Sequence, residues 1–177
     1  SGYCALACSL VKVYDATADV SMLARIGSGS ACRSVYGGFV KWNMGVKEDG
    51  TDSVAKQFQP AAHWPEMNVL CAVVKGAMKD VSSTKGMQLS LQTSPMMKER
   101  IDTVVNERMA AVSEAVQAKD FEKFATISMT DSDDLQEICR TTDPIIKYAT
   151  DDSFAVIKLV HAYNAAKGKK VLAYTFD

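Results

Sequence analysis

Residues 27–42, GSGSACRSVYGGFVKW, join a segment with helical periodicity to a segment with strand character. Before them, apolar residues recur every three or four positions over residues 2–14, which indicates an amphipathic helix. Asp19 is a suitable N-cap for a second helix over residues 20–26. Aromatic and β-branched side chains then dominate residues 39–44. We therefore predict two helices, a turn rich in glycine and serine, and a strand.

A second strand is predicted just after the first. The Asp49-Gly50 turn precedes residues 53–58, whose pattern allows them to pair with the strand over residues 39–44. Residues 59–65 contain two prolines and read as a surface connection. We place a domain boundary there, which divides the chain into residues 1–64 and 65–177.

The second part of the chain is predicted to be mostly helical. Its first segment, residues 67–74, is a nearly continuous apolar run that suits a buried strand. Residues 171–176 read as a final strand that ends at Asp177. Between these strands, helical spacing covers residues 85–94, 96–116, 120–140 and 151–166. The fold class that follows is α+β with two subdomains.

Composition excludes several classes of function. With 20 basic and 21 acidic residues the net charge is −1, so no overall field attracts nucleic acid or an anionic membrane. No apolar run approaches the length of a membrane span, and the chain does not start with a signal-peptide pattern. Five scattered cysteines without a C-x-x-C pair argue against a disulfide framework and against a structural metal. We expect a cytoplasmic protein.

Residues 27–34 form the first candidate anion site. Ser28 and Ser30 supply hydroxyl groups, the neighbouring glycines allow close approach of the backbone, and Arg33 can grip a carboxylate or phosphate with two parallel hydrogen bonds. A simple capped turn between two elements explains the same residue types. Both interpretations stay open at this point.

The second candidate site begins at Ser82. Three hydroxyl residues, Ser82, Ser83 and Thr84, stand where a helix starts, a place that favours phosphate. Capping of the helix is the alternative. Asp177 could act as a general base at the end of an apolar strand, or could simply mark the point where the chain turns.

Other polar residues are interpreted structurally. Asp131, Asp133 and Asp134 resemble metal ligands, but the hydroxyl residues among them and the helical pattern beyond favour a solvated helix cap. His161 is predicted to be a half-buried helix residue with a partner, and His63 lies in the connection that contains the prolines. We assign neither histidine a catalytic role.

Five motifs, taken in order, resemble one known family. They are GSGSACRSVYGGFVKW, DG-x-DS, HWPEM, SSTKGM and the terminal AYTFD. Together they are similar to the diphosphomevalonate decarboxylases, of the superfamily that also contains galactokinase, homoserine kinase, mevalonate kinase and phosphomevalonate kinase (GHMP). The resemblance implies a GHMP-kinase-like fold truncated at both ends. Residues 1–64 would be the remainder of the N-terminal ATP- and substrate-binding domain, and residues 65–177 the C-terminal domain.

The resemblance also implies an activity. ATP, with Mg²⁺, would phosphorylate the tertiary hydroxyl of mevalonate 5-diphosphate. Phosphate and CO₂ would then leave to give isopentenyl diphosphate, in the mevalonate pathway of isoprenoid and sterol biosynthesis. A homodimer is expected from the family. The alternatives are a kinase of the same superfamily, which would stop after phosphoryl transfer, and an inactive binding fragment.

Residue roles follow from the family motifs. Asp177 would orient the tertiary hydroxyl or accept its proton, and Arg33 would hold the carboxylate that is lost. Ser28 and Ser30 would hold the substrate, with Ser30 also positioning the transferred phosphoryl group. Contacts to the substrate diphosphate are expected from Ser83, Thr84 and the backbone near Met87.

Parts of the family site lie beyond the two ends of the chain. The ATP phosphate loop of the family precedes the first helix, where only Ser1 and Gly2 of its neighbourhood remain. The glycine-rich turn that follows the catalytic aspartate is also missing. We therefore expect the 177 residues alone to be inactive.

Overall fold

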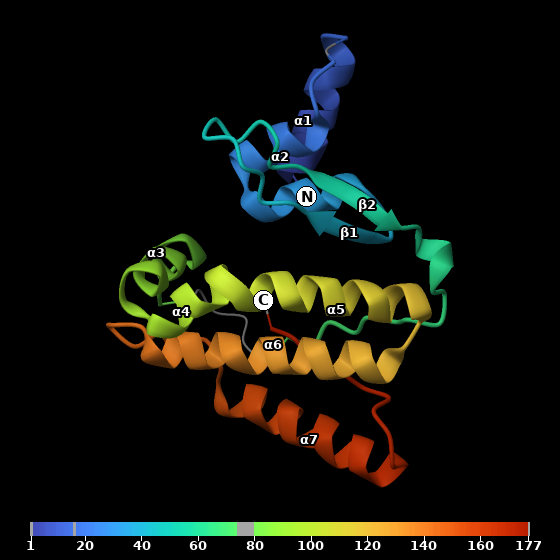
Figure 1. The fold of residues 1–177 in the computed structure, drawn as a ribbon, viewed down its shortest axis with the longest axis vertical. Coiled ribbons are helices and arrows are strands. Elements are labelled where there is room, and N and C mark those ends of the chain that lie inside the picture. Colours follow the sequence, from blue (N-terminus) through green and yellow to red (C-terminus); the bar gives the residue numbers. More distant parts are fainter. Residues whose placement is uncertain (1, 16, 74–79, 177) are drawn as a thin grey trace. The chain divides into compact units, whose positions relative to one another are not determined.

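The computed structural model describes residues 2–15, 17–73 and 80–176 (Figure 1). It contains two compact units, Ser1–Asn68 and Val69–Asp177. The division lies four residues beyond the boundary predicted after residue 64. Helices dominate and the described residues contain one small sheet, so the predicted α+β class is confirmed.

The first unit follows the predicted order of elements. Asp19 caps the second helix as predicted, because its side chain accepts a hydrogen bond from the backbone N–H of Met22 at 3.0 Å. Both predicted helices and both predicted strands are present. The elements are α1 (Gly2–Val13), α2 (Val20–Gly27), the 3₁₀ helix η1 (Gly29–Val35), β1 (Phe39–Trp42), β2 (Ala55–Gln59) and the 3₁₀ turn η2 (Ala61–His63).

Small side chains allow the first three helices to approach closely. Ala7 of α1, Ala24 of α2 and Ala31 of η1 form one buried cluster. At Gly27, an added Cβ would lie 2.2 Å from the ring of Tyr3, so a side chain at the end of α2 would have to displace that ring. This packing fixes where η1 begins.

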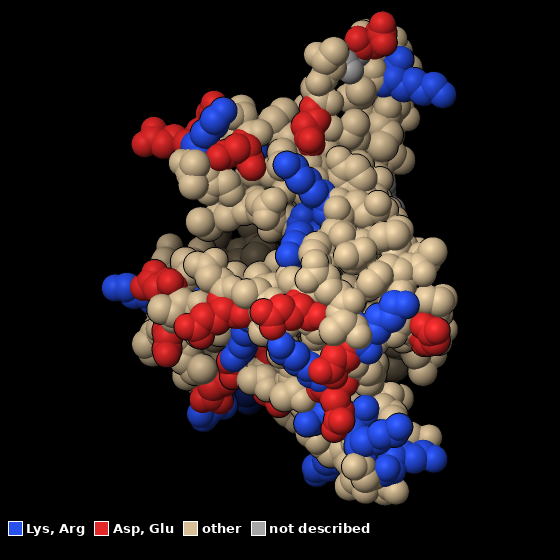
Figure 2. All heavy atoms as spheres, turned by 45° about the vertical axis from the view of Figure 1, so that its right-hand side comes forward, with Lys and Arg blue, Asp and Glu red and all other residues tan. Residues whose placement is uncertain are grey.

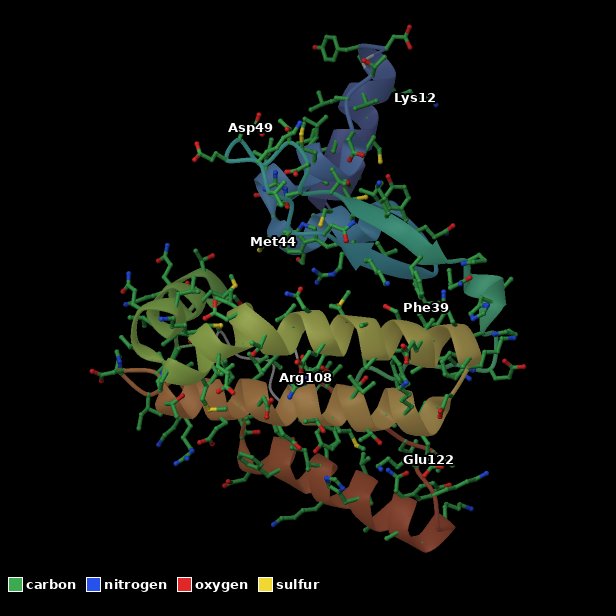
Figure 3. The ribbon with its side chains drawn as sticks, in the orientation of Figure 1. Lys12, Phe39, Met44, Asp49, Arg108 and Glu122 are labelled. Atoms are coloured by element: carbon green, nitrogen blue, oxygen red, sulfur yellow. The ribbon has the colours of Figure 1, made fainter. Side chains whose placement is uncertain are left out.

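β1 and β2 pair antiparallel, as predicted. Trp42 lies opposite Ala55, and a bulge after Phe39 shifts the register at the other end of the pair. Phe39, labelled in Figure 3, stacks on Trp64 with ring centroids 6.3 Å apart. The sheet therefore holds Trp42 at the end of β1, beside the loop that leads to β2.

The second unit is helical in its described part. α5 and α6 run antiparallel side by side, and α7 packs against the other side of α6 (Figure 1). The predicted helix from residue 96 begins one residue earlier and contains a π-helical turn, a widening that periodicity does not reveal. The elements are α3 (Ser83–Thr93), α4 (Pro95–Glu99), the π turn η3 (Arg100–Val104), α5 (Val105–Ala118), α6 (Phe121–Thr141) and α7 (Asp151–Lys167).

The strand predicted over residues 67–74 is wrong where the structure describes it. Residues 68–73 have no regular structure, and Val69, Leu70 and Val73 are 86%, 93% and 83% exposed. A strand forms only when its backbone can pair with another strand. The described part of the second unit offers none, and Val74 lies outside the described residues.

The strand predicted over residues 171–176 is also wrong, although the segment is held in place. The side chain of Asn164 accepts hydrogen bonds from the backbone N–H groups of Val171 and Leu172 at 2.9 and 3.0 Å. Its amide nitrogen donates to the Leu172 carbonyl at 2.9 Å. The side-chain amide thus satisfies backbone groups that a neighbouring strand would otherwise pair.

The three aspartates predicted to form a solvated cap lie inside α6, whose N-cap is Asp120. Arg100 donates to both carboxylate oxygens of Asp131, at 2.7 and 2.9 Å. Arg108, which Figure 3 shows between α5 and α6, donates to Asp131 and Asp134. Burial opposes ionisation of Asp131, but these hydrogen bonds outweigh it and keep its pKa below the usual range. The aspartates therefore join α6 to η3 and α5.

The third aspartate anchors the C-terminal segment. The Tyr174 hydroxyl donates to Asp133, with its oxygen 2.9 and 3.1 Å from the two carboxylate oxygens, and lies 3.2 Å from His161 Nε2. His161 has the partner that was predicted, but it is exposed rather than half-buried. Burial, and then the hydrogen bond to Asp133, raise the pKa of Tyr174 to about 12.

Replacing Tyr174 with phenylalanine should change how stability depends on alkaline pH. Because the folded-state pKa is about 12 and the ordinary value is 10, the neutral tyrosine contributes stability below pH 10 and loses it as pH rises toward 12. The wild type should therefore lose about 2 kcal/mol more than Tyr174→Phe by pH 11.5. Urea midpoints of the full-length gene product between pH 9 and 11.5 measure the difference.

Tyr163→Phe is the matched control for this experiment. Tyr163 also lies near the C-terminus, on α7, but it is 45% exposed. Its variant should follow the wild-type curve, because Tyr174 is retained. A Tyr174→Phe curve parallel to that of the wild type would contradict the expectation.

Surface charge agrees with the near-zero net charge. Figure 2 shows acidic and basic side chains interspersed on the visible face, without a broad field of one sign. No helix within the described residues is both long and apolar enough to cross a bilayer.

Candidate functional site

The first candidate segment lies where α2 ends and η1 begins. The backbone N–H of Ser28 completes α2 by donating to the Ala24 carbonyl at 3.1 Å. The Ser28 carbonyl accepts a hydrogen bond from the backbone N–H of Ala31 at 2.9 Å. The Ser28 side chain makes no capping hydrogen bond to η1. Its hydroxyl oxygen lies 3.4 Å from that of Ser30. The turn is therefore formed by backbone groups, and the two hydroxyls remain next to each other.

Burial of one side of η1 orients the other side outward. Ala31 and Cys32 are buried, and the Cys32 thiol donates to the Gly29 carbonyl at 3.0 Å. Burial also raises the pKa of Cys32. Ser30 and Arg33, which flank this pair in sequence, are exposed. The structure thus places Ser28, Ser30 and Arg33 together on one short segment.

An aromatic residue to which the family resemblance assigns no role lies beside Arg33. The guanidinium carbon of Arg33 is 5.8 Å from the centre of the Trp42 ring. Trp42 follows Arg33 by nine residues, so sequence spacing alone does not indicate the contact. Its only signal was the aromatic character of the predicted strand.

The second candidate segment lies at the start of α3. Ser82 is the N-cap, and its hydroxyl accepts from the backbone N–H of Lys85 at 3.3 Å. Ser83 and Thr84 are exposed, and their hydroxyls form no hydrogen bonds with the described part of the chain. Met87, one turn further along, is also exposed. Among the described residues, Ser82 therefore performs the capping, and the Ser83 and Thr84 hydroxyls are not engaged in it.

Close packing positions the start of α3. At Gly86, an added Cβ would lie 2.4 Å from the Tyr148 hydroxyl, which also donates to the Ser82 carbonyl at 3.4 Å. Ser90 and Thr142 share a buried hydrogen bond of 2.9 Å further along the helix. A glycine inside a helical pattern was the available sequence signal for this contact.

Asp177, the predicted catalytic aspartate, lies outside the described residues. Phe176, just before it, packs against the core of the second unit beside Tyr174. The other predicted site residues divide between the units: Ser28, Ser30 and Arg33 belong to the first, and Ser83, Thr84 and Met87 to the second. Within the described ranges, no three His, Cys, Asp or Glu side chains are placed to hold a metal ion.

Family comparisons match both parts of the chain. The diphosphomevalonate decarboxylase-like N-terminal domain matches residues 1–55. The mevalonate 5-diphosphate decarboxylase C-terminal domain matches residues 69–177. The second match begins where the second compact unit begins.

Individual relatives agree with these matches. The diphosphomevalonate decarboxylase of Rattus norvegicus is 47% identical over 177 residues, which are 100% of this chain and 44% of that protein. The structure of mevalonate diphosphate decarboxylase from Trypanosoma brucei is 63% identical, with a TM-score of 0.96 over 99% of this chain and 46% of its own. A structure described as MDDEF in complex with MVAPP, AMPPCP and magnesium is 31% identical, with a TM-score of 0.82 over 100% of this chain and 54% of its own.

The chain belongs to the diphosphomevalonate decarboxylase family. The resemblance and the GHMP-kinase-like fold predicted from the motifs are thereby confirmed. The chain spans less than half the length of the rat relative.

Proposed function

We propose that the full-length gene product containing this chain is an ATP-dependent carboxy-lyase. It converts mevalonate 5-diphosphate to isopentenyl diphosphate, with release of ADP, phosphate and CO₂. The observation that carries the proposal is the segment that holds Ser28, which is half-buried, next to the exposed Ser30 and Arg33, in a chain that belongs to this family. The relative that binds MVAPP, AMPPCP and magnesium supports the same substrate, with ATP and Mg²⁺.

Arg33 is proposed to hold the substrate carboxylate. A guanidinium can donate two parallel hydrogen bonds to a carboxylate, and such charge-assisted pairs are stronger than neutral ones. A very tight pair would oppose the loss of CO₂, because it stabilises the group that must leave. We therefore assign Arg33 to orienting the carboxylate rather than to supplying most of the rate.

The hydroxyl groups are proposed to hold the phosphates of the substrate. Ser28 and Ser30 lie close enough to contact one anionic group together, and Ser30 is also proposed to position the transferred phosphoryl group. Ser83, Thr84 and the backbone near Met87 would contact the diphosphate at the N-terminus of α3, where the helix dipole favours negative charge.

Asp177 is proposed to orient the tertiary hydroxyl or to accept its proton during phosphoryl transfer. Phosphorylation replaces a poor leaving group, hydroxide, with phosphate. As the C–O bond to phosphate breaks, positive charge develops on the tertiary carbon, and the electron pair of the C–CO₂ bond forms the new double bond. The protein contributes mainly by positioning these groups and by electrostatic stabilisation.

Magnesium is proposed to enter with the ATP phosphates, because the described residues offer no ligand cluster of their own. Bound there, it would neutralise phosphate charge. Residues 1–64 are proposed to belong to the ATP- and substrate-binding domain, and residues 65–177 to the C-terminal domain. A homodimer and a cytoplasmic location complete the proposal, on the basis of the family.

The test uses the full-length gene product with ATP and mevalonate 5-diphosphate, and measures ADP and CO₂ together. Equal amounts of the two products are expected, with activity lost in Asp177→Ala. Release of ADP without CO₂ would instead identify a kinase of the same superfamily. If a folded protein released neither ADP nor CO₂, that result would favour a binding role.

A further inference from the structure

Arg33 differs from the other arginines of the chain in what holds its guanidinium. The other four donate hydrogen bonds to carboxylates or to a backbone carbonyl; they are Arg25, Arg100, Arg108 and Arg140. Arg33 has neither kind of partner among the residues that the structure describes. Its described contact is with the ring of Trp42, whose centre is 5.8 Å away, within the range of cation–π pairs.

This kind of contact leaves the hydrogen-bonding capacity of Arg33 unused. The N–H groups of a guanidinium lie in its plane, whereas an aromatic ring attracts its positive charge without accepting those hydrogen bonds. An arginine already paired with a protein carboxylate would have to give up that pair to bind an anion. Arg33 therefore has a restricted position and free donors at the same time.

Trp42 is itself held from two sides. Its indole N–H donates to the Ser53 hydroxyl at 3.1 Å, and Ser53, which is buried, donates to the Asn43 carbonyl at 3.3 Å. On the other side, an added Cβ at Gly29 would lie 3.3 Å from Cη2 of the Trp42 ring. The loop before β2 and the first residue of η1 thus contact the Trp42 ring on two sides, and Trp42, which is 38% exposed, remains accessible to Arg33.

We propose that Trp42 is a positioning residue that orients the Arg33 guanidinium toward the substrate carboxylate and leaves its N–H donors free. The inference rests on the proposed function, because it takes that carboxylate as the ligand of Arg33. Trp42 acts through Arg33 and need not touch the substrate.

A double-mutant cycle in the full-length gene product tests this role. Trp42→Leu should lower kcat/KM for mevalonate 5-diphosphate by about fivefold to thirtyfold, whereas Trp42→Phe, which keeps an aromatic face, should retain most of the activity. In an Arg33→Gln background, Trp42→Leu should have little further effect, because the group it orients is gone. Equal losses from Trp42→Leu in both backgrounds would overturn the proposal.

Phe58→Leu is the matched control. The Lys41 ammonium lies 4.0 Å from the centre of the Phe58 ring, in a second cation–π contact on the same sheet. Removing this ring should leave kcat/KM close to that of the wild type. A loss equal to that of Trp42→Leu would show that any disturbance of the sheet reduces activity, and would overturn the specific role of Trp42.

A spectroscopic measurement separates this inference from the proposed function. The indole N–H resonance of Trp42 can be assigned by its disappearance in Trp42→Phe, and it should shift in Arg33→Gln whether or not the protein turns over substrate. An unchanged resonance would overturn the contact. If the folded wild type released no ADP or CO₂ but the Trp42 resonance still shifted in Arg33→Gln, the proposed function would be overturned. The contact by which Trp42 holds Arg33 would still be supported.

Discussion

Replacing Arg33 with glutamine in the full-length gene product should lower kcat/KM for mevalonate 5-diphosphate by about a hundredfold to a thousandfold. Glutamine retains a donor but loses both the charge and the planar fork that matches a carboxylate. Because Arg33 is exposed and has no ion pair within the described residues, its loss should hardly affect stability. Steady-state kinetics with ADP and CO₂ both quantified, together with a thermal unfolding curve, measure the two effects.

Two further variants sharpen this expectation. Arg33→Lys keeps the charge without the fork, and its activity should lie between those of the wild type and Arg33→Gln. Arg140→Gln removes an exposed arginine whose described partner is Glu137 on the same helix, and it should leave kcat/KM within about twofold of the wild type. If Arg33→Gln retained a third or more of wild-type activity, the assignment of Arg33 to the substrate carboxylate would fail.

Replacing Gly38 with alanine should destabilise the first unit by about 3 kcal/mol or more. Gly38 has a φ of +74°, a conformation that costs an L-residue energy, and an added Cβ would lie 2.4 Å from the Gln59 carbonyl oxygen and 2.6 Å from the Ala61 nitrogen. Both neighbours are backbone atoms, so relief requires the chain itself to move. The urea midpoint of the full-length gene product, followed by circular dichroism, measures the loss.

The adjacent glycine provides the control. An added Cβ at Gly37 would meet nothing within 4 Å. Gly37→Ala should therefore change stability by no more than about 0.5 kcal/mol. Equal stabilities of the Gly37→Ala and Gly38→Ala proteins would show that the backbone just before β1 tolerates a side chain at position 38, contrary to the geometry.

Local signals account for the elements that were predicted correctly. Asp19 marks the start of α2 through a hydrogen bond from the backbone N–H of Met22, only three residues away. The strand pair β1–β2 was also predictable, because its two members are close in sequence and a turn joins them. In these cases the interacting groups lie within one short stretch of chain.

The unsuccessful predictions depended on partners distant in sequence. Residues 68–73 and 171–176 have strand-like composition, but composition does not supply a second strand to pair with. In the later segment, the Asn164 side chain instead accepts the hydrogen bond that the Val171 backbone N–H would otherwise donate to a neighbouring strand. Asp131 looked like part of a solvated cap because Arg100, its partner from another helix, lies 31 residues away. Periodicity describes which face of an element is apolar, and it does not say what that face or its charges meet.

The sequence by itself determined the helical framework of this protein, its family motifs, and the identity of the candidate residues, including Asp177, which lies outside the described structure. Those properties follow from side-chain chemistry and local backbone preferences. Only the tertiary structure decided that the Ser28 hydroxyl is not used for capping, that Arg33 contacts Trp42 and no carboxylate among the described residues, and that the Tyr174 hydroxyl donates to Asp133. Each of these contacts depends on folding that brings separate elements within a few ångströms, which no pattern along one segment specifies.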